Sequence, residues 1–318
     1  MKILIAGGSG FVGSNMLELL IKVPNIRIFS TYFKSKPRIK SHRIKYIRAD
    51  LAKFKTCIKI TDKMDVVLML AGHVFTQRSL RKFNNKIYQN LEINLNMAKA
   101  STLNDVKKYF WLSSSTGYPD LRKKLIENDF FKKDPPTNYF VPGYQARFLE
   151  KIIYSFSLNS KITKIFSIRP SEIFGKYDNF DFNTCHALPA YIRRFCEALE
   201  EKNKTIYIQG DILKNKNYLF ASDLANIIYR LINKKISDKY MVVNISSKKN
   251  YNLKKLISII SKLKEFKNVK INYSNVDNKS IKFDRLLNNN KLNKIIKNYK
   301  DTKIENCLKN IINWYLKK

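Results

Sequence analysis

The run KILIAGGSGFVGSNMLELLIKV, residues 2–23, decides the fold class. Its largely apolar start predicts a buried strand, and the periodicity of residues 13–23 predicts a helix soon after it. Between them stands the pattern Gly7-x-x-Gly10-x-x-Gly13. These glycines permit, in order, a tight turn, close approach of the backbone to a pyrophosphate, and close packing of the helix on the strand. Because amide groups at a helix N-terminus attract anions, the run predicts a dinucleotide-binding turn.

Strands and helices go on alternating after this run. Strand-length apolar runs occur at 26–32, 43–50, 65–72, 107–115 and 162–170, with a helical pattern at 90–101. We therefore expect an α/β fold, a Rossmann-type doubly wound parallel sheet with a smaller C-terminal α/β lobe for the substrate. The predicted dinucleotide-binding domain spans 1–172, with a returning segment near 217–234, and residues 173–318 mainly form the lobe.

The charge balance is strongly basic. Lys and Arg number 61 against 25 Asp and Glu, a formal net charge of +36 over 318 residues. The basic residues are spread along the whole chain, and Lys, Asn and Ile share A/T-rich codons. Genome composition therefore explains the excess, and no nucleic-acid partner is expected.

Other classes are also disfavoured. No stretch reaches the roughly 20 apolar residues of a membrane helix, and the N-terminus lacks a signal peptide, so we expect a cytoplasmic protein without membrane contact. The four cysteines have no C-x-x-C spacing and no histidines at ligand spacing, so no metal site is expected.

The end of the second predicted strand bears on the choice of dinucleotide. The stretch FSTYFKSK, residues 29–36, has no carboxylate to hold ribose hydroxyls, but it has Thr31 and, just behind, Lys34. This favours NADP(H), with NAD(H) possible. The candidate cofactor-binding residues are Gly7, Gly10, Phe11, Val12, Gly13, Thr31, Lys34, Asp50, Leu51, Ala71 and Gly72.

Five further segments occur in an order that is typical of one protein family. They are YQNLEINLNMAKAS (88–101), LSSSTGYP (112–119), FGKYDNFDFNTCHALPAYIRRFCEAL (174–199), NYLFASDLA (217–225) and INWYLKK (312–318). Through them the chain resembles the extended short-chain dehydrogenase/reductases from end to end, and within these the GDP-L-fucose synthases most of all. The resemblance implies a nucleotide-sugar enzyme with a GDP-linked substrate and a homodimeric assembly.

The resemblance also implies a catalytic pair. In that family a tyrosine handles the proton on the sugar C4 oxygen, a lysine at i+4 lowers the pKa of this tyrosine, and a serine binds the same oxygen. A free phenol titrates near 10, so a cation is needed to make it useful at neutral pH. Ser114 takes the serine's place, with Ser115 beside it as a substrate contact.

The tyrosine and lysine positions are not both kept. In one register Tyr144 is the acid, Phe148 replaces the lysine, and Arg147 at i+3 offers a cation. In the other, Pro142 and Ala146 occupy the two positions. The first leaves usable chemistry, although Tyr144 could equally be an ordinary pocket aromatic.

Epimerisation in that family uses a cysteine and a histidine. Thr116 stands at the cysteine's place and is too weakly acidic to replace it. His186 keeps the histidine's place, as an acid, a substrate contact or a plain hydrogen-bonding residue. Asn179 is a further candidate substrate contact. Arg194 and Lys216 stand where the family binds the substrate diphosphate, although both could be solvated surface charges.

Together these residues favour an NADP(H)-dependent oxidoreductase acting on a nucleotide-activated sugar. Loss of the cysteine argues against double epimerisation, so reduction of a GDP-4-keto-6-deoxy sugar at C4 is the sharper expectation. One alternative is a relative that binds dinucleotide and sugar nucleotide without turnover. Another is a nucleotide-sugar epimerase or dehydratase, which would need a further acid/base pair.

Overall fold

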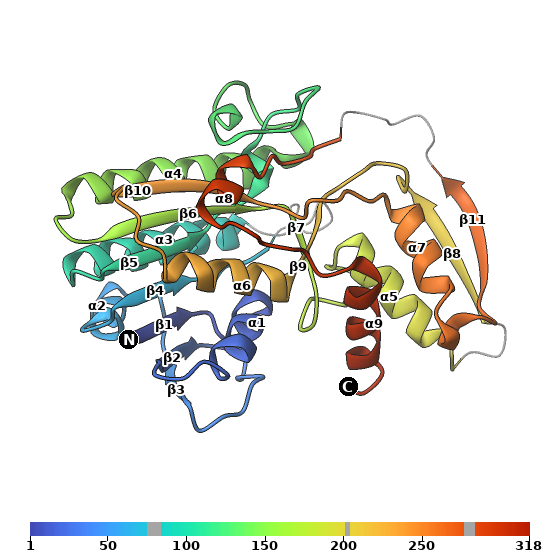
Figure 1. Cartoon of the computed structure of the whole chain (residues 1–318), viewed down its shortest axis with the longest axis horizontal. Helices are drawn as coiled ribbons and strands as arrows, with labels where there is room; N and C mark the ends of the chain where they lie inside the picture. Colours follow the sequence, from blue (N-terminus) through green and yellow to red (C-terminus); the bar gives the residue numbers. More distant parts are fainter. Residues whose placement is uncertain (75–83, 201–203, 277–283) are drawn as a thin grey trace.

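A seven-stranded parallel sheet forms the centre of the molecule. The computed structural model describes residues 1–74, 84–200, 204–276 and 284–318 (Figure 1). The strand order is β10-β6-β5-β4-β1-β2-β3, and all neighbours run parallel. The strands are β1 (Lys2–Ala6), β2 (Arg27–Tyr32), β3 (Ile44–Arg48), β4 (Val66–Met69), β5 (Lys108–Leu112), β6 (Lys164–Pro170) and β10 (Tyr240–Ile245). The predicted Rossmann-type doubly wound sheet is confirmed.

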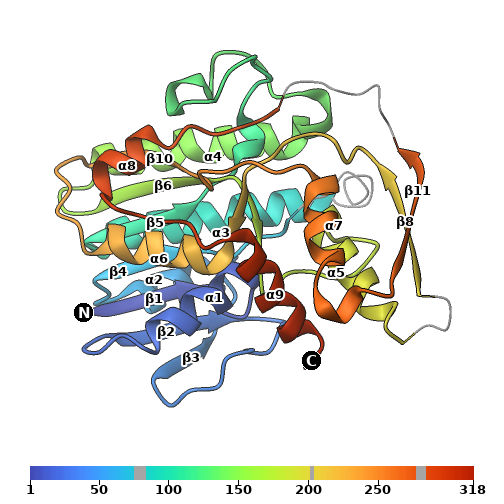
Figure 2. The same cartoon turned by 45° about the vertical axis from the view of Figure 1, so that its right-hand side comes forward.

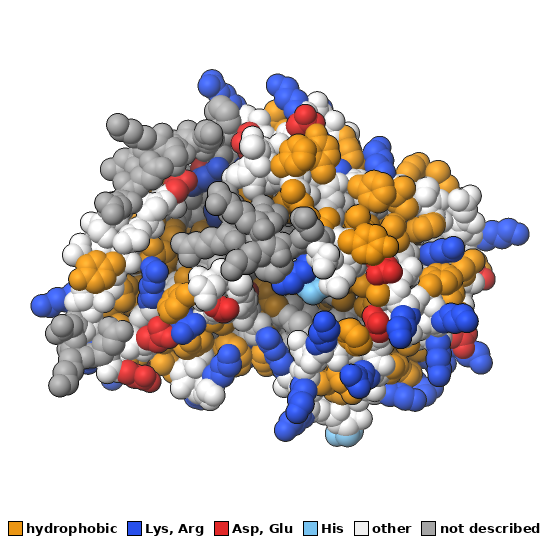
Figure 3. All heavy atoms as spheres, turned by 180° about the vertical axis from the view of Figure 1, so that it is seen from behind, with side chains coloured by type: hydrophobic (Ala, Val, Ile, Leu, Met, Phe, Trp, Pro, Cys, Tyr) orange, Lys and Arg blue, Asp and Glu red, His pale blue; other side chains and the backbone are white. Residues whose placement is uncertain are grey.

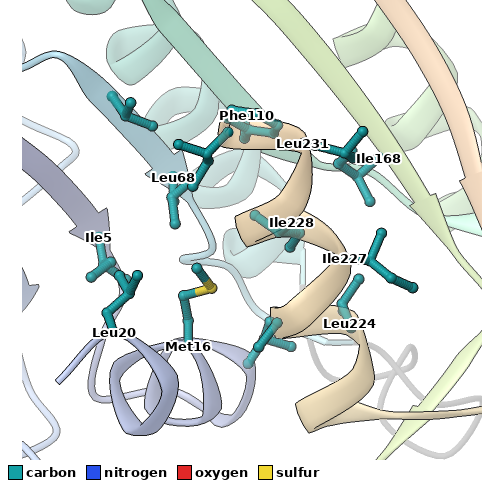
Figure 4. Packing of buried hydrophobic residues seen from close by; sticks show 14 of the residues in the cluster. Ile5, Met16, Leu20, Leu68, Phe110, Ile168, Leu224, Ile227, Ile228 and Leu231 are labelled. Atoms are coloured by element: carbon teal, nitrogen blue, oxygen red, sulfur yellow. The ribbon is translucent and has the colours of Figure 1, made fainter. Parts of the chain in front are cut away.

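Helices cover both faces of this sheet, which is why its inner strands read as nearly continuous apolar runs. One face packs against α1 (Phe11–Leu20), α6 (Ala221–Ile232) and α8 (Asn290–Ile295). The other packs against α2 (Phe54–Thr61), α3 (Asn84–Leu103) and α4 (Phe140–Asn159). Figure 4 shows Met16 of α1 and Ile228 of α6 meeting strand residues Ile5 and Leu68.

The C-terminal lobe has a hydrophobic core of its own. It contains α5 (Ala187–Glu197), α7 (Leu253–Ser261) and α9 (Ile304–Tyr315). Two small parallel sheets complete it, β8 (Thr205–Gly210) with β11 (Lys270–Val276), and β7 (Glu172–Phe174) with β9 (Tyr218–Phe220). Figure 2 shows α5, α7, β8 and β11 lying beyond the carboxyl ends of the central strands.

The chain crosses between the sheet and the lobe more than once. After β9 it returns to the sheet as α6 and then as β10, the strand that pairs with β6 at the end of the sheet. The returning part therefore reaches beyond the expected 217–234 to residue 245. The domain bounds themselves stay a prediction.

Charged side chains are distributed over the surface. Figure 3 shows Lys and Arg side chains scattered over one face, with Asp, Glu and exposed hydrophobic groups between them. Within the described ranges, no helix has both the length and the apolar character required to cross a membrane.

Candidate functional site

The glycine turn after β1 leaves no room for a side chain at Gly7 or Gly13 and little at Gly10. Gly7 has a φ of +91°, and a Cβ added there would lie 2.7 Å from the Cα of Ala71. A Cβ on Gly13 would lie 2.2 Å from the carbonyl oxygen of Gly7. At Gly10, the N-cap of α1, the nearest atom would be 3.2 Å away. The turn therefore brings backbone and helix N-terminus together in a shape that fits a pyrophosphate.

Thr31 and Lys34 are the cofactor-binding residues predicted at the end of the second strand, and Thr31 is buried under the glycine turn. Thr31 is 2% exposed, and its Oγ1 accepts a hydrogen bond from the Gly7 amide at 3.0 Å. The Thr31 hydroxyl thus supports the glycine turn. Lys34 is exposed beyond the end of β2. The NADP preference stays a prediction.

The remaining cofactor candidates follow neighbouring strands of the sheet. Asp50 and Leu51 come after β3, and Ala71 and Gly72 after β4. The Asp50 carboxylate accepts a hydrogen bond from the amide of Ala52 at 3.1 Å, and Leu51 is buried. Because carboxyl ends of parallel strands share one edge of the sheet, these loops gather on the same side as the glycine turn.

Asn90 of α3 was not singled out from the sequence. Its Oδ1 accepts a hydrogen bond from the amide of His73 at 2.7 Å, and its Nδ2 donates to the carbonyl of His73 at 2.9 Å. Nδ2 also lies 3.4 Å from Oε1 of Gln145 on α4. Asn90 therefore fixes the loop after β4 against both helices.

The turn after β5 carries the predicted serines. Ser114 is the N-cap of the short 3-10 helix η2 (Ser115–Gly117). Its Oγ accepts a hydrogen bond from the Thr116 amide at 3.2 Å and lies 2.9 Å from the Thr116 hydroxyl. The carbonyl of Ser115 accepts a hydrogen bond from Arg285 at 3.1 Å.

The face of α4 that meets this turn carries Gly143. A Cβ added to Gly143 would lie 2.8 Å from the carbonyl oxygen of Thr116 and 2.7 Å from Cβ of Pro135. Gly143 is therefore the point of contact between helix and turn, and neither predicted register places a catalytic residue there. The helix packs so tightly at this point that a larger residue would displace it.

Tyr144 lies to one side of the contact. It is 37% exposed, and its hydroxyl donates to the Asp134 carboxylate at 2.5 Å. This hydrogen bond, together with burial and the charge of Asp134, raises the pKa of Tyr144. Phe148 is 50% exposed. Proton transfer by Tyr144 would require a lower pKa, so its catalytic role stays a prediction.

Arg147 is buried and bonds to two backbone carbonyls. Its Nε donates to the carbonyl of Gly117 at 2.8 Å and its Nη2 donates to the carbonyl of Lys133. The guanidinium carbon lies 5.7 Å from the centre of the Tyr144 ring. These contacts tie α4 to the turn after β5.

The lobe candidates occupy separate places. His186 is the exposed N-cap of α5, and the Asn179 side chain donates to the Thr184 hydroxyl at 2.8 Å. Arg194 donates to the carbonyl of Tyr207 at 3.3 Å and lines a hollow of about 350 Å³ on the lobe. The substrate contacts predicted for these residues stay predictions.

Lys216 forms an ion pair that the sequence did not reveal. Its Nζ lies 2.6 Å from a carboxylate oxygen of Glu172. Glu172 begins β7, and Lys216 lies two residues before β9, the strand that pairs with β7. Burial lowers the pKa of Lys216, but the charge of Glu172 outweighs it and the net shift is upward. Among the described residues, no cluster of ligands could hold a metal ion.

The carboxyl group of Asp178, next to Asn179, makes the stability of the fold depend on pH. Burial raises its pKa to about 7, and its Oδ2 has no hydrogen-bond partner within the described part of the chain. An unfolded aspartate titrates near 3.9, so folding takes up a proton between about pH 4 and 7, and the contribution of Asp178 to stability falls as the pH rises through that window.

We therefore expect Asp178→Asn to stabilise the protein at about pH 8 relative to the wild type, and to do so much less at about pH 4. Urea denaturation of both proteins at the two pH values measures this difference. Asp181→Asn, a change at an exposed neighbour, is the control. An equal effect of Asp178→Asn at both pH values would contradict the expectation.

A parallel sheet with a glycine turn after its central first strand defines a Rossmann-type dinucleotide-binding protein. The family model "NAD dependent epimerase/dehydratase family" matches residues 3–246. The chain belongs to this family. Membership of this family supports the prediction that the protein is an enzyme.

Related proteins share sequence over different lengths. The chain is 26% identical over 279 residues to GDP-L-colitose synthase of Yersinia pseudotuberculosis, which covers 84% of this chain and 83% of that protein. It is 31% identical over 142 residues to GDP-L-fucose synthase of Escherichia coli, covering 44% and 43%. The fold matches UDP-glucose 4-epimerase of Thermotoga maritima with a TM-score of 0.83 at 17% identity, over 100% of this chain and 99% of that one.

Proposed function

We propose that this protein is an NADP(H)-dependent oxidoreductase that reduces the C4 keto group of a GDP-linked 4-keto-6-deoxy sugar. One observation carries the proposal: the glycine turn after β1 and the Ser114 turn after β5 lie at the same edge of one sheet. The register of β1, β4 and β5 aligns Ala6 with Met69 and Met69 with Trp111. A dinucleotide on the first turn would therefore reach a sugar on the second.

The residues of the chain have distinct parts in this reaction. When bound, the nicotinamide supplies the hydride. The Ser114 hydroxyl would hydrogen-bond to the C4 oxygen, and a phenol would give that oxygen a proton. Two phenols, Tyr139 and Tyr144, lie on the segment that runs past the turn. Lys216 would attract the diphosphate once its pairing with Glu172 is relaxed.

The names of the related synthases support the GDP-linked substrate. The two relatives described above are named as synthases of a GDP-linked sugar. Thr116 in the place of the family's cysteine supports reduction without double epimerisation. A homodimer remains part of this proposal on the ground of resemblance, and a cytoplasmic location remains the expectation from the sequence.

The direct test is to mix the purified protein with a GDP-4-keto-6-deoxy sugar and NADPH. We expect nicotinamide absorbance to fall and a GDP-deoxyhexose to form, with NADH slower than NADPH. Calorimetry with GDP and with each dinucleotide runs alongside. If several GDP-4-keto sugars bind and none is reduced with either coenzyme, the reductase proposal fails.

A second function has an observation in its favour. Gly143 fills the contact between α4 and the Ser114 turn, while Tyr144 bonds to Asp134. This arrangement favours a relative that binds dinucleotide and sugar nucleotide without turnover. Binding of both ligands by calorimetry, without reduction, is the result that this alternative predicts.

A further inference from the structure

A second phenol, Tyr139, lies close to the Ser114 turn in different surroundings from Tyr144. It ends the short 3-10 helix η4 (Thr137–Tyr139), directly before α4, and is half-buried. The guanidinium carbon of Arg285 lies 4.6 Å from the centre of its ring. The Tyr139 side chain interacts electrostatically with Arg285, and with Lys216 as well. Tyr139 thus has the Arg285 guanidinium as a direct neighbour, with the Lys216–Glu172 pair further away.

Arg285 links this phenol to the turn. Its Nη2 donates to the carbonyl oxygens of Ser115 at 3.1 Å and Tyr118 at 2.5 Å, and lies 3.4 Å from that of Thr116. Only 15% of its side chain is exposed. One buried guanidinium therefore holds the backbone around Ser114 and the ring of Tyr139 together.

The two phenols differ in the charge beside them. A cation near a phenol favours the phenolate that proton donation leaves behind, and an anion opposes it. The Arg285 guanidinium, which also pairs with Asp120, lies over the Tyr139 ring. Tyr144 has the Arg147 guanidinium near its ring, but its hydroxyl donates to the carboxylate of Asp134. The Tyr139 ring therefore has a guanidinium beside it, whereas the Tyr144 hydroxyl is bonded to a carboxylate.

We propose that Tyr139 is the proton donor to the C4 oxygen of the sugar and that Arg285 stabilises its phenolate, an inference that rests on the proposed function. As the C4 carbon receives the hydride, the carbonyl π bond breaks and the oxygen takes the Tyr139 proton. The phenol O–H bond breaks and the phenolate regains a proton from water. The sugar is reduced to the alcohol.

The test compares Tyr139→Phe with Tyr144→Phe, the same substitution five positions apart. We expect Tyr139→Phe to lower kcat by about 100-fold or more, the usual contribution of a general acid, and to lower it far more than Tyr144→Phe does. Tyr154→Phe, at an exposed tyrosine further along α4, is the control that should leave kcat within about twofold. Without coenzyme, Tyr139→Phe should weaken binding of the GDP-4-keto sugar by about threefold to tenfold, because one hydrogen bond is lost, and leave GDP binding unchanged.

Each outcome decides one question. Loss of activity in Tyr144→Phe with full activity in Tyr139→Phe overturns the inference and leaves the proposed function standing. An inactive wild type overturns the proposed function. The binding comparison then tests the contact between Tyr139 and the sugar by itself. Equal affinity of Tyr139→Phe and wild type for the keto sugar refutes that contact. Unchanged GDP binding and thermal unfolding in Tyr139→Phe show that the variant is folded.

Discussion

Replacing Arg169 with methionine is expected to lower the free energy of unfolding by about 3–5 kcal/mol, the usual cost of removing one partner of a buried ion pair. Arg169 on β6 is 2% exposed, and its Nε donates to Glu150 of α4 at 3.0 Å. It also donates to the hydroxyl of Tyr118 at 2.9 Å and the carbonyl of Glu127 at 2.8 Å. The substitution leaves the Glu150 carboxylate buried, with the Ser167 hydroxyl as its one remaining donor among the described residues.

Denaturant unfolding of wild type and variant measures this loss. Arg193→Met is the matched control, because its pair with Glu197 is 30% and 40% exposed and should contribute no more than about 1 kcal/mol. Adding Glu150→Leu to Arg169→Met should recover part of the stability by removing the stranded charge. Equal losses in Arg169→Met and Arg193→Met would show that the buried pair is not a major support of the fold.

Gly13→Ala is expected to have the largest effect on coenzyme binding. The added Cβ would lie 2.2 Å from the carbonyl oxygen of Gly7 and 2.7 Å from the Cα of Gly8, both backbone atoms that cannot yield cheaply. Either α1 or the turn must move, so we expect a loss of about 1–3 kcal/mol of stability. The helix N-terminus would then no longer face the pyrophosphate, and dinucleotide affinity should fall at least tenfold, about 1.4 kcal/mol.

Calorimetry with NADPH and denaturant unfolding test both parts of this expectation. Gly210→Ala is the control: Gly210 also has a positive φ, +85°, but a Cβ there meets no atom of the described residues within 4 Å. It should cost about 1 kcal/mol through backbone strain and leave NADPH binding intact. Normal NADPH binding by Gly13→Ala would mean that the dinucleotide does not use this turn.

The fold could be predicted because its signals are local. The apolar runs at 2–6, 65–72 and 162–170 contain β1, β4 and β6, and the glycines after β1 occupy positions where a Cβ would collide. Strand β10 was harder to foresee, since nothing within residues 240–245 tells which sheet they join.

The contacts around the candidate site could not be predicted from the sequence in the same way. Helical periodicity places Tyr144 and Phe148 on one stripe of α4, but it does not say which side of the helix meets the Ser114 turn. That depends on Gly143 packing on Thr116. Arg285 reaches the same turn from about 170 residues away, a separation at which no spacing pattern operates.

The late return of β10 has a consequence for synthesis on the ribosome. An emerging chain can assemble six strands from residues 1–170, but β6 then presents an open row of amides and carbonyls until residue 245 has left the exit tunnel. Unpaired edges of this kind recruit strands from other chains. A fragment that stops near residue 172 should therefore aggregate when expressed alone, and supplying the remainder as a separate polypeptide should restore its solubility.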